Sequence, residues 1–161
     1  MVLDILTAAD RVNLLELYAR SSMLLDLGRC QEWTDLFEAG AVVRCSAGRQ
    51  FRGHDELLKL ARDTVEGRCS LALVPMSSPV RCRHVLSNVS LFAEGNRKAL
   101  GYAYLSVGRK GDLTARQVAA GVYFDQLWRS ASGCWRFSSR LFTSDETTGT
   151  LREPGRVDAL R

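Results

Sequence analysis

Histidine is scarce in this sequence, and one of its two histidines occupies a position where it could transfer protons. His84 lies in the segment 80–90, VRCRHVLSNVS, whose apolar residues fall on both alternations of a strand. A strand that is apolar on both sides is usually covered on both sides. A histidine in such a strand is either a core residue bonded to the backbone or a working acid/base. The function therefore depends on which description holds and on what pairs with His84.

The N-terminal half of the chain has the pattern of helices. Thr7 and Asp10 resemble a capping box, and the apolar positions from Ala8 onward recur with a helical period up to Gly28, a typical C-terminal stop. Asp26 falls in the last turn, where a carboxylate meets the negative end of the helix dipole. It therefore needs a stabilising partner, or it is simply solvated. Two shorter helices are expected over 31–37 and 54–66.

The C-terminal half has the pattern of strands. Four strand-like segments are joined by short turns that contain glycine, which predicts an antiparallel meander, and a short hairpin is expected before the third helix. Helices followed by strands indicate an α+β fold. We expect a cone-shaped, strongly curved antiparallel sheet of four to six strands, with three helices that enclose a pocket. The four segments are 81–93, 98–109, 114–129 and 134–143.

Length and composition indicate one globular domain. The chain has 161 residues, of which 46% are hydrophobic and 25% are charged. We expect the domain to span 1–146 and the polar segment 147–161 to form a tail. The net charge of +4 is spread over single arginines, which argues against a nucleic-acid partner.

The sequence also predicts the cellular setting and the absence of metal. It has no apolar run long enough for a membrane span and no secretory leader, so we expect a cytoplasmic protein with no membrane partner. The five cysteines are odd in number, widely spaced and free of any CxxC motif. Neither a disulfide framework nor a metal site is expected from them.

Several segments, in their order and spacing, resemble one known family. They are the WTDLF segment 33–37, the strand AVVRC at 41–45, FRGHDELLK at 51–59, RHVLSN at 83–88 and GVYFDQLWRSASGCWRFSSR at 121–140. Together they resemble the SnoaL-like branch of the nuclear-transport-factor-2-like superfamily over about 8–143. The resemblance implies the cone-shaped fold. Its relatives include scytalone dehydratase-type enzymes, β subunits of ring-hydroxylating dioxygenases and non-catalytic binding domains.

The resemblance to scytalone dehydratase-type enzymes implies a catalytic pair. In those enzymes an Asp near the end of the first helix pairs with a His on the strand after the connector, and Asp26 and His84 match these positions. A carboxylate that accepts from one imidazole nitrogen fixes the tautomer and leaves the other nitrogen to move a proton. The expected activity is a cofactor-free elimination, isomerisation or cyclisation of a small, largely apolar molecule such as a polyketide or aromatic intermediate.

The sequence departs from those enzymes at the residues that polarise the substrate. Their second catalytic His corresponds to Ala103 here, and the Tyr beside the helix Asp corresponds to Leu25. The enzyme hypothesis therefore keeps a His/Asp acid/base pair, with no electrophile identified.

Strand alternation predicts which other residues face the pocket, and on the strand 114–129 the family resemblance implies that Phe124 faces inward. We expect Asn88 to orient a carbonyl, or else to be structural, and Arg140 to bind an anionic group, or else to form an ion pair at the surface or at an interface. Tyr18 lies near Asp26 on its helix, or in the core. Tyr123 and Asp125 are expected on the face away from the cavity. The predicted substrate-binding residues are Tyr18, Leu86, Asn88, Ala103, Phe124 and Arg140.

Two other functions and an assembly state stay open. The chain could be a scaffold subunit that resembles a dioxygenase β subunit, with a catalytic α subunit as partner, or a domain that binds a small molecule without chemistry. The tyrosines expected on the outer face, at 102, 104 and 123, predict a homo-oligomer, either a dimer or a trimer. An open pocket with His84 and Asp26 in hydrogen-bond contact would favour the enzyme.

Overall fold

The first helix begins and ends at the predicted signals. The computed structural model describes residues 6–45, 48–68, 81–111 and 117–145. Helix α1 (Ala8–Asp26) starts with the predicted capping box, in which Thr7 and Asp10 bond each other's side chain and backbone. It ends at Asp26, and Gly28 follows with a φ of 74°, which glycine adopts without strain; the Gly28 N–H donates to the Leu25 carbonyl at 2.9 Å. Interactions between neighbouring residues therefore set the ends of α1 and place Asp26 in its last turn.

The remaining elements follow the predicted order of helices and then strands. The second helix is shorter than expected, and the first strand begins earlier, at Phe37. The elements are α2 (Cys30–Thr34), β1 (Phe37–Cys45), β2 (Gln50–Arg52), α3 (Gly53–Val65), β3 (Cys82–Ala93), β4 (Lys98–Arg109), β5 (Gln117–Arg129) and β6 (Trp135–Ser144).

The sheet is mixed. Its strand order is β2-β1-β6-β5-β4-β3, and the predicted meander from β3 to β6 is antiparallel throughout. Strand β1 pairs with β2 in the antiparallel sense but with β6 in the parallel sense. The expectation of a purely antiparallel sheet is wrong at this one pairing. No turn joins β1 to β6, so no hairpin imposes their relative direction.

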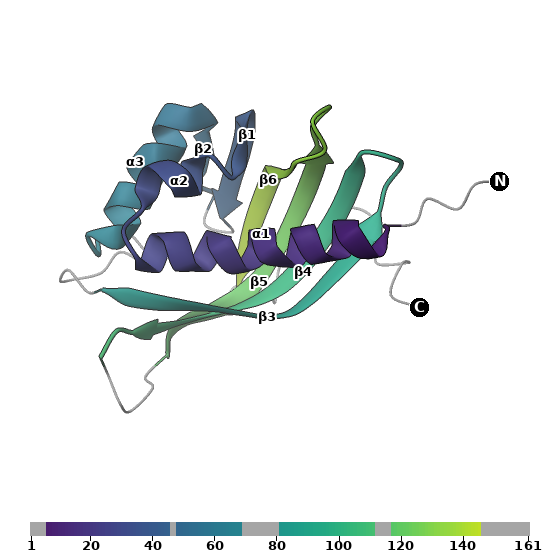
Figure 1. Ribbon diagram of the computed structural model, residues 1–161. Coiled ribbons are helices and arrows are strands. Elements are labelled where there is room, and N and C mark those ends of the chain that lie inside the picture. Colours follow the sequence, from purple (N-terminus) through teal and green to yellow (C-terminus); the bar gives the residue numbers. More distant parts are fainter. Residues whose placement is uncertain (1–5, 46–47, 69–80, 112–116, 146–161) are drawn as a thin grey trace.

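The helices lie on one face of the curved sheet and enclose the core with it. Figure 1 shows α1 crossing in front of the strands, with α2 and α3 beside β1 at one end. Aromatic rings fill the space between these layers, where Trp33, Phe37 and Phe137 form a chain of ring contacts at 4.6 and 5.1 Å. None of the helices in the described part of the chain is long and apolar enough to cross a membrane. The expected tail, 147–161, lies outside the described residues.

Register shifts interrupt four of the strand pairings in the described residues. Pairing of β3 with β4 shifts between Ser87 and Ser90, where Asn88 has a φ of 52°. Pairing of β5 with β6 shifts in the same way, opposite Ser138. A bulge adds one residue to a strand and turns the following side chains to the other face.

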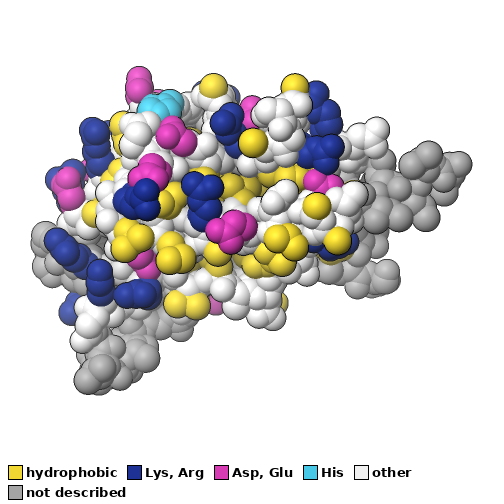
Figure 2. Space-filling view, in the orientation of Figure 1, with side chains coloured by type: hydrophobic (Ala, Val, Ile, Leu, Met, Phe, Trp, Pro, Cys, Tyr) yellow, Lys and Arg dark blue, Asp and Glu magenta, His cyan; other side chains and the backbone are white. Residues whose placement is uncertain are grey.

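Helix α1 is apolar on its outer side as well as on its core side. Figure 2 shows hydrophobic side chains along the exposed face of this helix. Val12 and Met23 are among them, at 65% and 60% exposure.

Candidate functional site

Asp26 and His84 are in direct contact. The Nδ1 atom of His84 lies 2.8 Å from Oδ1 of Asp26, and the backbone N–H of His84 donates to both carboxylate oxygens at 3.2 and 3.3 Å. The guanidinium of Arg83 adds an ion pair to Oδ2 at 3.4 Å. These hydrogen bonds and the ion pair offset the unfavourable position of a carboxylate at the C-terminal, negative end of the helix dipole.

The two side chains meet because α1 ends beside an edge strand of the sheet. Asp26 is the last residue of α1, and β3 is an edge strand of the sheet. Half of the N–H groups of an edge strand point away from the sheet, and that of His84 is directed at α1. One carboxylate therefore holds both the backbone and the ring of His84, which fixes the ring orientation.

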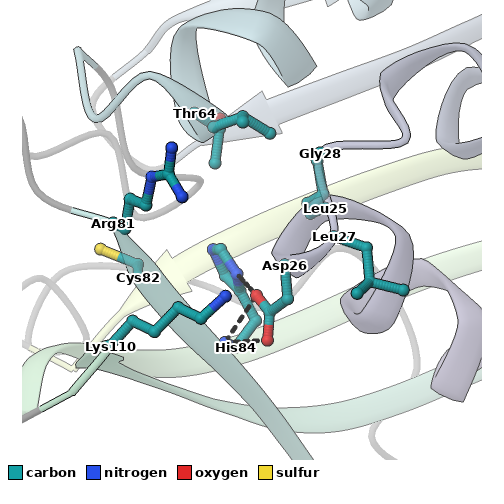
Figure 3. Close-up of a pocket in the computed structure, with 10 residues that line it drawn as sticks. Leu25, Asp26, Leu27, Gly28, Thr64, Arg81, Cys82, His84 and Lys110 are labelled. Atoms are coloured by element: carbon teal, nitrogen blue, oxygen red, sulfur yellow. Dashed lines mark hydrogen bonds and ion pairs between the residues drawn. The ribbon is translucent and has the colours of Figure 1, made fainter.

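The second ring nitrogen of His84 has no hydrogen-bond partner among the residues that the structure describes. Nε2 is buried, although the residue lines a pocket of about 220 Å³. With Nδ1 donating to Asp26, Nε2 carries the lone pair that can accept a proton. Figure 3 shows the ring between Asp26 on one side and the side chains of Arg81 and Thr64 on the other.

The pocket lining is mixed rather than largely apolar. Leu25, Leu27 and Val65 supply apolar surface, whereas Thr64, Arg81, Cys82 and Lys110 are polar or charged. The sequence analysis missed these polar residues. Strand alternation could have found Cys82, which lies two residues before His84 and so shares its face. Burial, followed by the charge of Asp26, raises the pKa of the Cys82 thiol, so Cys82 is a neutral thiol rather than a nucleophile at neutral pH.

Arg140 faces inward as predicted, but its charge is already neutralised. Its Nε and one terminal nitrogen each donate to Asp125 at 2.9 Å, and its guanidinium lies 4.1 Å from the ring centres of both Tyr123 and Phe137. Burial opposes the charge of Arg140, but the attraction of Asp125 and its hydrogen bonds outweigh this and raise the pKa of Arg140. Arg140 is therefore an internal ion-pair residue and does not line the pocket of His84.

The predicted orientation of β5 is wrong. Ala103 on β4 is directly opposite Tyr123 on β5, and both are buried at 1% exposure, so Tyr123 and Asp125 point inward. Phe124 points to the outer face, where its ring packs edge-on against Tyr102 at 5.3 Å. The expectation that Phe124 lines the cavity fails because paired residues share a face, and Phe124 pairs with Tyr102.

The prediction for Asn88 fails for a different reason. The side chain is exposed, because Asn88 occupies the bulge of β3 in a left-handed conformation that Asn tolerates better than most residues. Beyond the bulge it is Val89 and Leu91 that pack on the core. Asn88 therefore does not reach the pocket of His84.

The other predicted lining residues belong to the core. Leu86 is half-buried against it, and Ala103 and Tyr18 are each 1% exposed. Burial raises the pKa of Tyr18 well above its ordinary value, so its phenol stays neutral. Of the eight residues that the sequence analysis assigned to the site, the structure brings only Asp26 and His84 to this pocket.

The site offers no set of metal ligands. Within residues 6–45, 48–68, 81–111 and 117–145, no three His, Cys, Asp or Glu side chains are grouped to hold an ion. The other histidine, His54, is 45% exposed at the start of α3 and contacts Gln31 at 2.8 Å, far along the chain from the dyad.

Comparison with protein families and solved structures agrees with this architecture. Residues 6–141 match the family model described as the SnoaL-like domain. No curated protein sequence matches the chain.

Solved structures share the fold at low sequence identity. A protein with a cystatin-like fold from Nostoc punctiforme PCC 73102 has a TM-score of 0.72 and 22% identity, covering 88% of this chain and 96% of its own. ActVI-ORFA from Streptomyces coelicolor has a TM-score of 0.68 and 15% identity, with coverage of 85% and 98%. LinA has a TM-score of 0.69 and 18% identity, with coverage of 91% and 95%.

Proposed function

The chain belongs to the SnoaL-like domain family, and from this premise we propose that it is a cofactor-free acid/base enzyme acting on a small molecule. His84 transfers the proton, and Asp26 holds its ring. The observation that carries the proposal is that only one of the two ring nitrogens of His84 is engaged by Asp26. Nδ1 is bound to Asp26 at 2.8 Å, whereas Nε2 is buried at the pocket without a hydrogen-bond partner in the described part of the chain.

This arrangement suits proton abstraction next to a carbonyl. Nε2 takes a proton from the carbon, and the electron pair of the broken C–H bond moves onto the carbonyl oxygen to give an enolate. The imidazolium then returns the proton. If the proton goes to a β-hydroxyl, the C–O bond breaks and water leaves, which is a dehydration; if it goes to another carbon, the product is an isomer. Asp26 stabilises the imidazolium between the two steps.

The pocket favours a small reacting group. Its volume of about 220 Å³ is below the range of pockets that enclose a drug-sized ligand. Leu25, Leu27 and Val65 provide the apolar contact that a hydrocarbon ring would need. We therefore keep a compact, partly apolar substrate, such as an aromatic or polyketide fragment, as the proposed class.

Proton exchange tests the acid/base role without knowledge of the natural substrate. We expect the protein to accelerate exchange of the protons next to the carbonyl of small ketones, from cyclohexanone to 1-tetralone, in D2O, followed by proton NMR. His84→Gln should slow exchange about a hundredfold or more, because general acid/base catalysis contributes at least that much. His54→Gln is the matched control and should leave the rate unchanged.

A second variant separates catalysis from folding. In His84→Ala, added imidazole should restore part of the exchange rate, which a purely structural histidine would not show. A folded His84→Gln protein with the full rate would contradict the proposal. Binding of the ketones without any accelerated exchange would instead make the chain a binding domain.

Assembly remains part of the proposal. The outer face of the sheet carries ring contacts between Phe92, Tyr102 and Phe124, and Tyr104 beside them is 55% exposed. An apolar face of this kind supports a homo-oligomer. Tyr123, which the sequence analysis assigned to the same face, is internal and does not contribute.

A further inference from the structure

Two cations stand opposite each other at the pocket of His84. Strands β3 and β4 pair Cys82 with Arg109, so the next residues outward, Arg81 and Lys110, face each other across the strand ends. The N–H of Lys110 donates to the carbonyl of Arg81 at 2.9 Å, which fixes this juxtaposition in the backbone. Both side chains line the pocket.

Like charges directly opposite each other on neighbouring strands are unfavourable. The ordinary remedy is a carboxylate between them. Asp26 is the one acidic residue among the described pocket residues, and its oxygens already accept from His84 and Arg83. Acidic residues near the end of α3 are engaged elsewhere, because Asp63 pairs with Lys59 and Arg68, and Glu66 pairs with Arg68.

The two cations extend over the pocket from the strand ends. Figure 3 shows Lys110 reaching toward His84 and Asp26, and Arg81 extending between His84 and Thr64. Figure 2 shows Lys and Arg side chains gathered at this end of the molecule, around the start of β3. A cleft rim of one charge raises the local concentration of ligands of the opposite charge.

We propose that Arg81 and Lys110 form a carboxylate-binding pair, so that the site takes small organic acids with their reacting carbon at Nε2 of His84. As an inference about substrate class, this rests on the proposed acid/base function. The planar guanidinium can hold a carboxylate through two parallel N–H donors, and the ammonium supplies a point charge. The same charges stabilise the enolate oxygen that forms when His84 removes a proton. The pair thereby supplies the electrophile that the sequence analysis could not identify.

A charged ligand and its neutral counterpart of the same shape test the proposal. We expect the protein to bind 4-nitrobenzoate about five- to tenfold more tightly than 4-nitrobenzamide at low ionic strength, as measured by calorimetry. The ratio is modest because both ion pairs are partly exposed and therefore weakened by solvent, and added salt should reduce it further. Arg81→Met/Lys110→Met should bind the two compounds equally.

The control is a lysine at the other end of the same strand. Lys98→Met removes an exposed charge from the start of β4, away from the pocket of His84, and should keep the preference for the carboxylate. The inference is overturned if the wild-type protein binds both compounds equally, or if the double variant keeps the full preference.

The dyad variant separates this inference from the proposed function. His84→Gln should lose proton exchange but retain the preference for 4-nitrobenzoate. If His84→Gln keeps the exchange rate while the preference still depends on Arg81 and Lys110, the acid/base proposal fails and the carboxylate site stands. If exchange depends on His84 but no variant changes the preference, the acid/base proposal stands and this inference fails.

Discussion

Replacing Arg140 should lower the free energy of unfolding and should not weaken ligand binding. Arg140→Met leaves the Asp125 carboxylate, which is 3% exposed, without either of its two 2.9 Å hydrogen bonds. Removing one partner of a buried ion pair costs about 3–5 kcal/mol. Because a domain of this kind is stable by only about 5–15 kcal/mol, the loss is a large share of the total. The guanidinium also fills the space between Tyr123 and Phe137, which methionine occupies only in part.

A double-mutant cycle in urea measures the pair. The free energies of unfolding of Arg140→Met, Asp125→Asn and the double variant are obtained from tryptophan fluorescence. We expect each single variant to lose about 3–5 kcal/mol and the double variant to lose clearly less than the sum, since it strands no buried charge. Arg136→Met, an exposed position on the same strand, is the control and should change stability by no more than about 0.5 kcal/mol.

The two interpretations of Arg140 give opposite results. If Arg140→Met leaves the free energy of unfolding within about 0.5 kcal/mol of the wild type, the pair does not stabilise the fold as argued. If that variant also loses the preference for 4-nitrobenzoate, Arg140 is the anion-binding residue that the sequence analysis predicted, and the assignment to Arg81 and Lys110 is wrong.

Two further predictions concern Asp10, at the start of α1, and Asn88, in the bulge of β3. Burial alone would raise the pKa of Asp10, but hydrogen bonds from Thr7, Trp135 and Arg129 outweigh it and lower the pKa from 3.8 to about 2. A carboxyl whose pKa is lower in the folded protein stabilises the fold at pH values above its unfolded pKa, and this contribution is lost as the pH falls toward 2. Asp10→Asn should therefore lower the free energy of unfolding by about 1–2 kcal/mol at pH 7. The difference from the wild type should vanish when unfolding is measured at progressively lower pH. Asn88→Gly should keep both stability and ketone exchange within error, whereas Asn88→Val should lose about 1–3 kcal/mol in thermal unfolding because a β-branched residue resists the φ of 52°.

Features governed by neighbouring residues were predictable from the sequence. The capping box of Thr7 and Asp10 and the stop at Gly28 depend on contacts within a few residues, and both are confirmed. The meander is also confirmed, because short glycine turns leave an antiparallel return as the only close-packed choice. The contact between Asp26 and His84 followed from the family resemblance, which carries long-range information that periodicity lacks.

The orientation of β5 was not predictable by the same means. The family resemblance placed Phe124 in the cavity, and strand alternation then assigned its neighbours Tyr123 and Asp125 to the outer face. That assignment fails because Arg140, fifteen residues later in the chain, neutralises Asp125 in the interior. Whether a charge can be buried depends on a partner that only the folded register identifies.

The bulge at Asn88 governs which residues meet at the pocket. In the part of the ladder between the β3–β4 turn and the bulge, Ala93 pairs with Ala99. If this register continued without interruption, Arg81 would lie opposite Gly111. The extra residue at the bulge moves the pairing by one, so that Arg81 faces Lys110 instead. The same step decides which face His84 occupies, since a shift of one residue sends every following side chain to the opposite side of a strand. The dyad and the cation pair are therefore set by a single local irregularity, although neither contacts Asn88, and neither could be located by counting back from the turn.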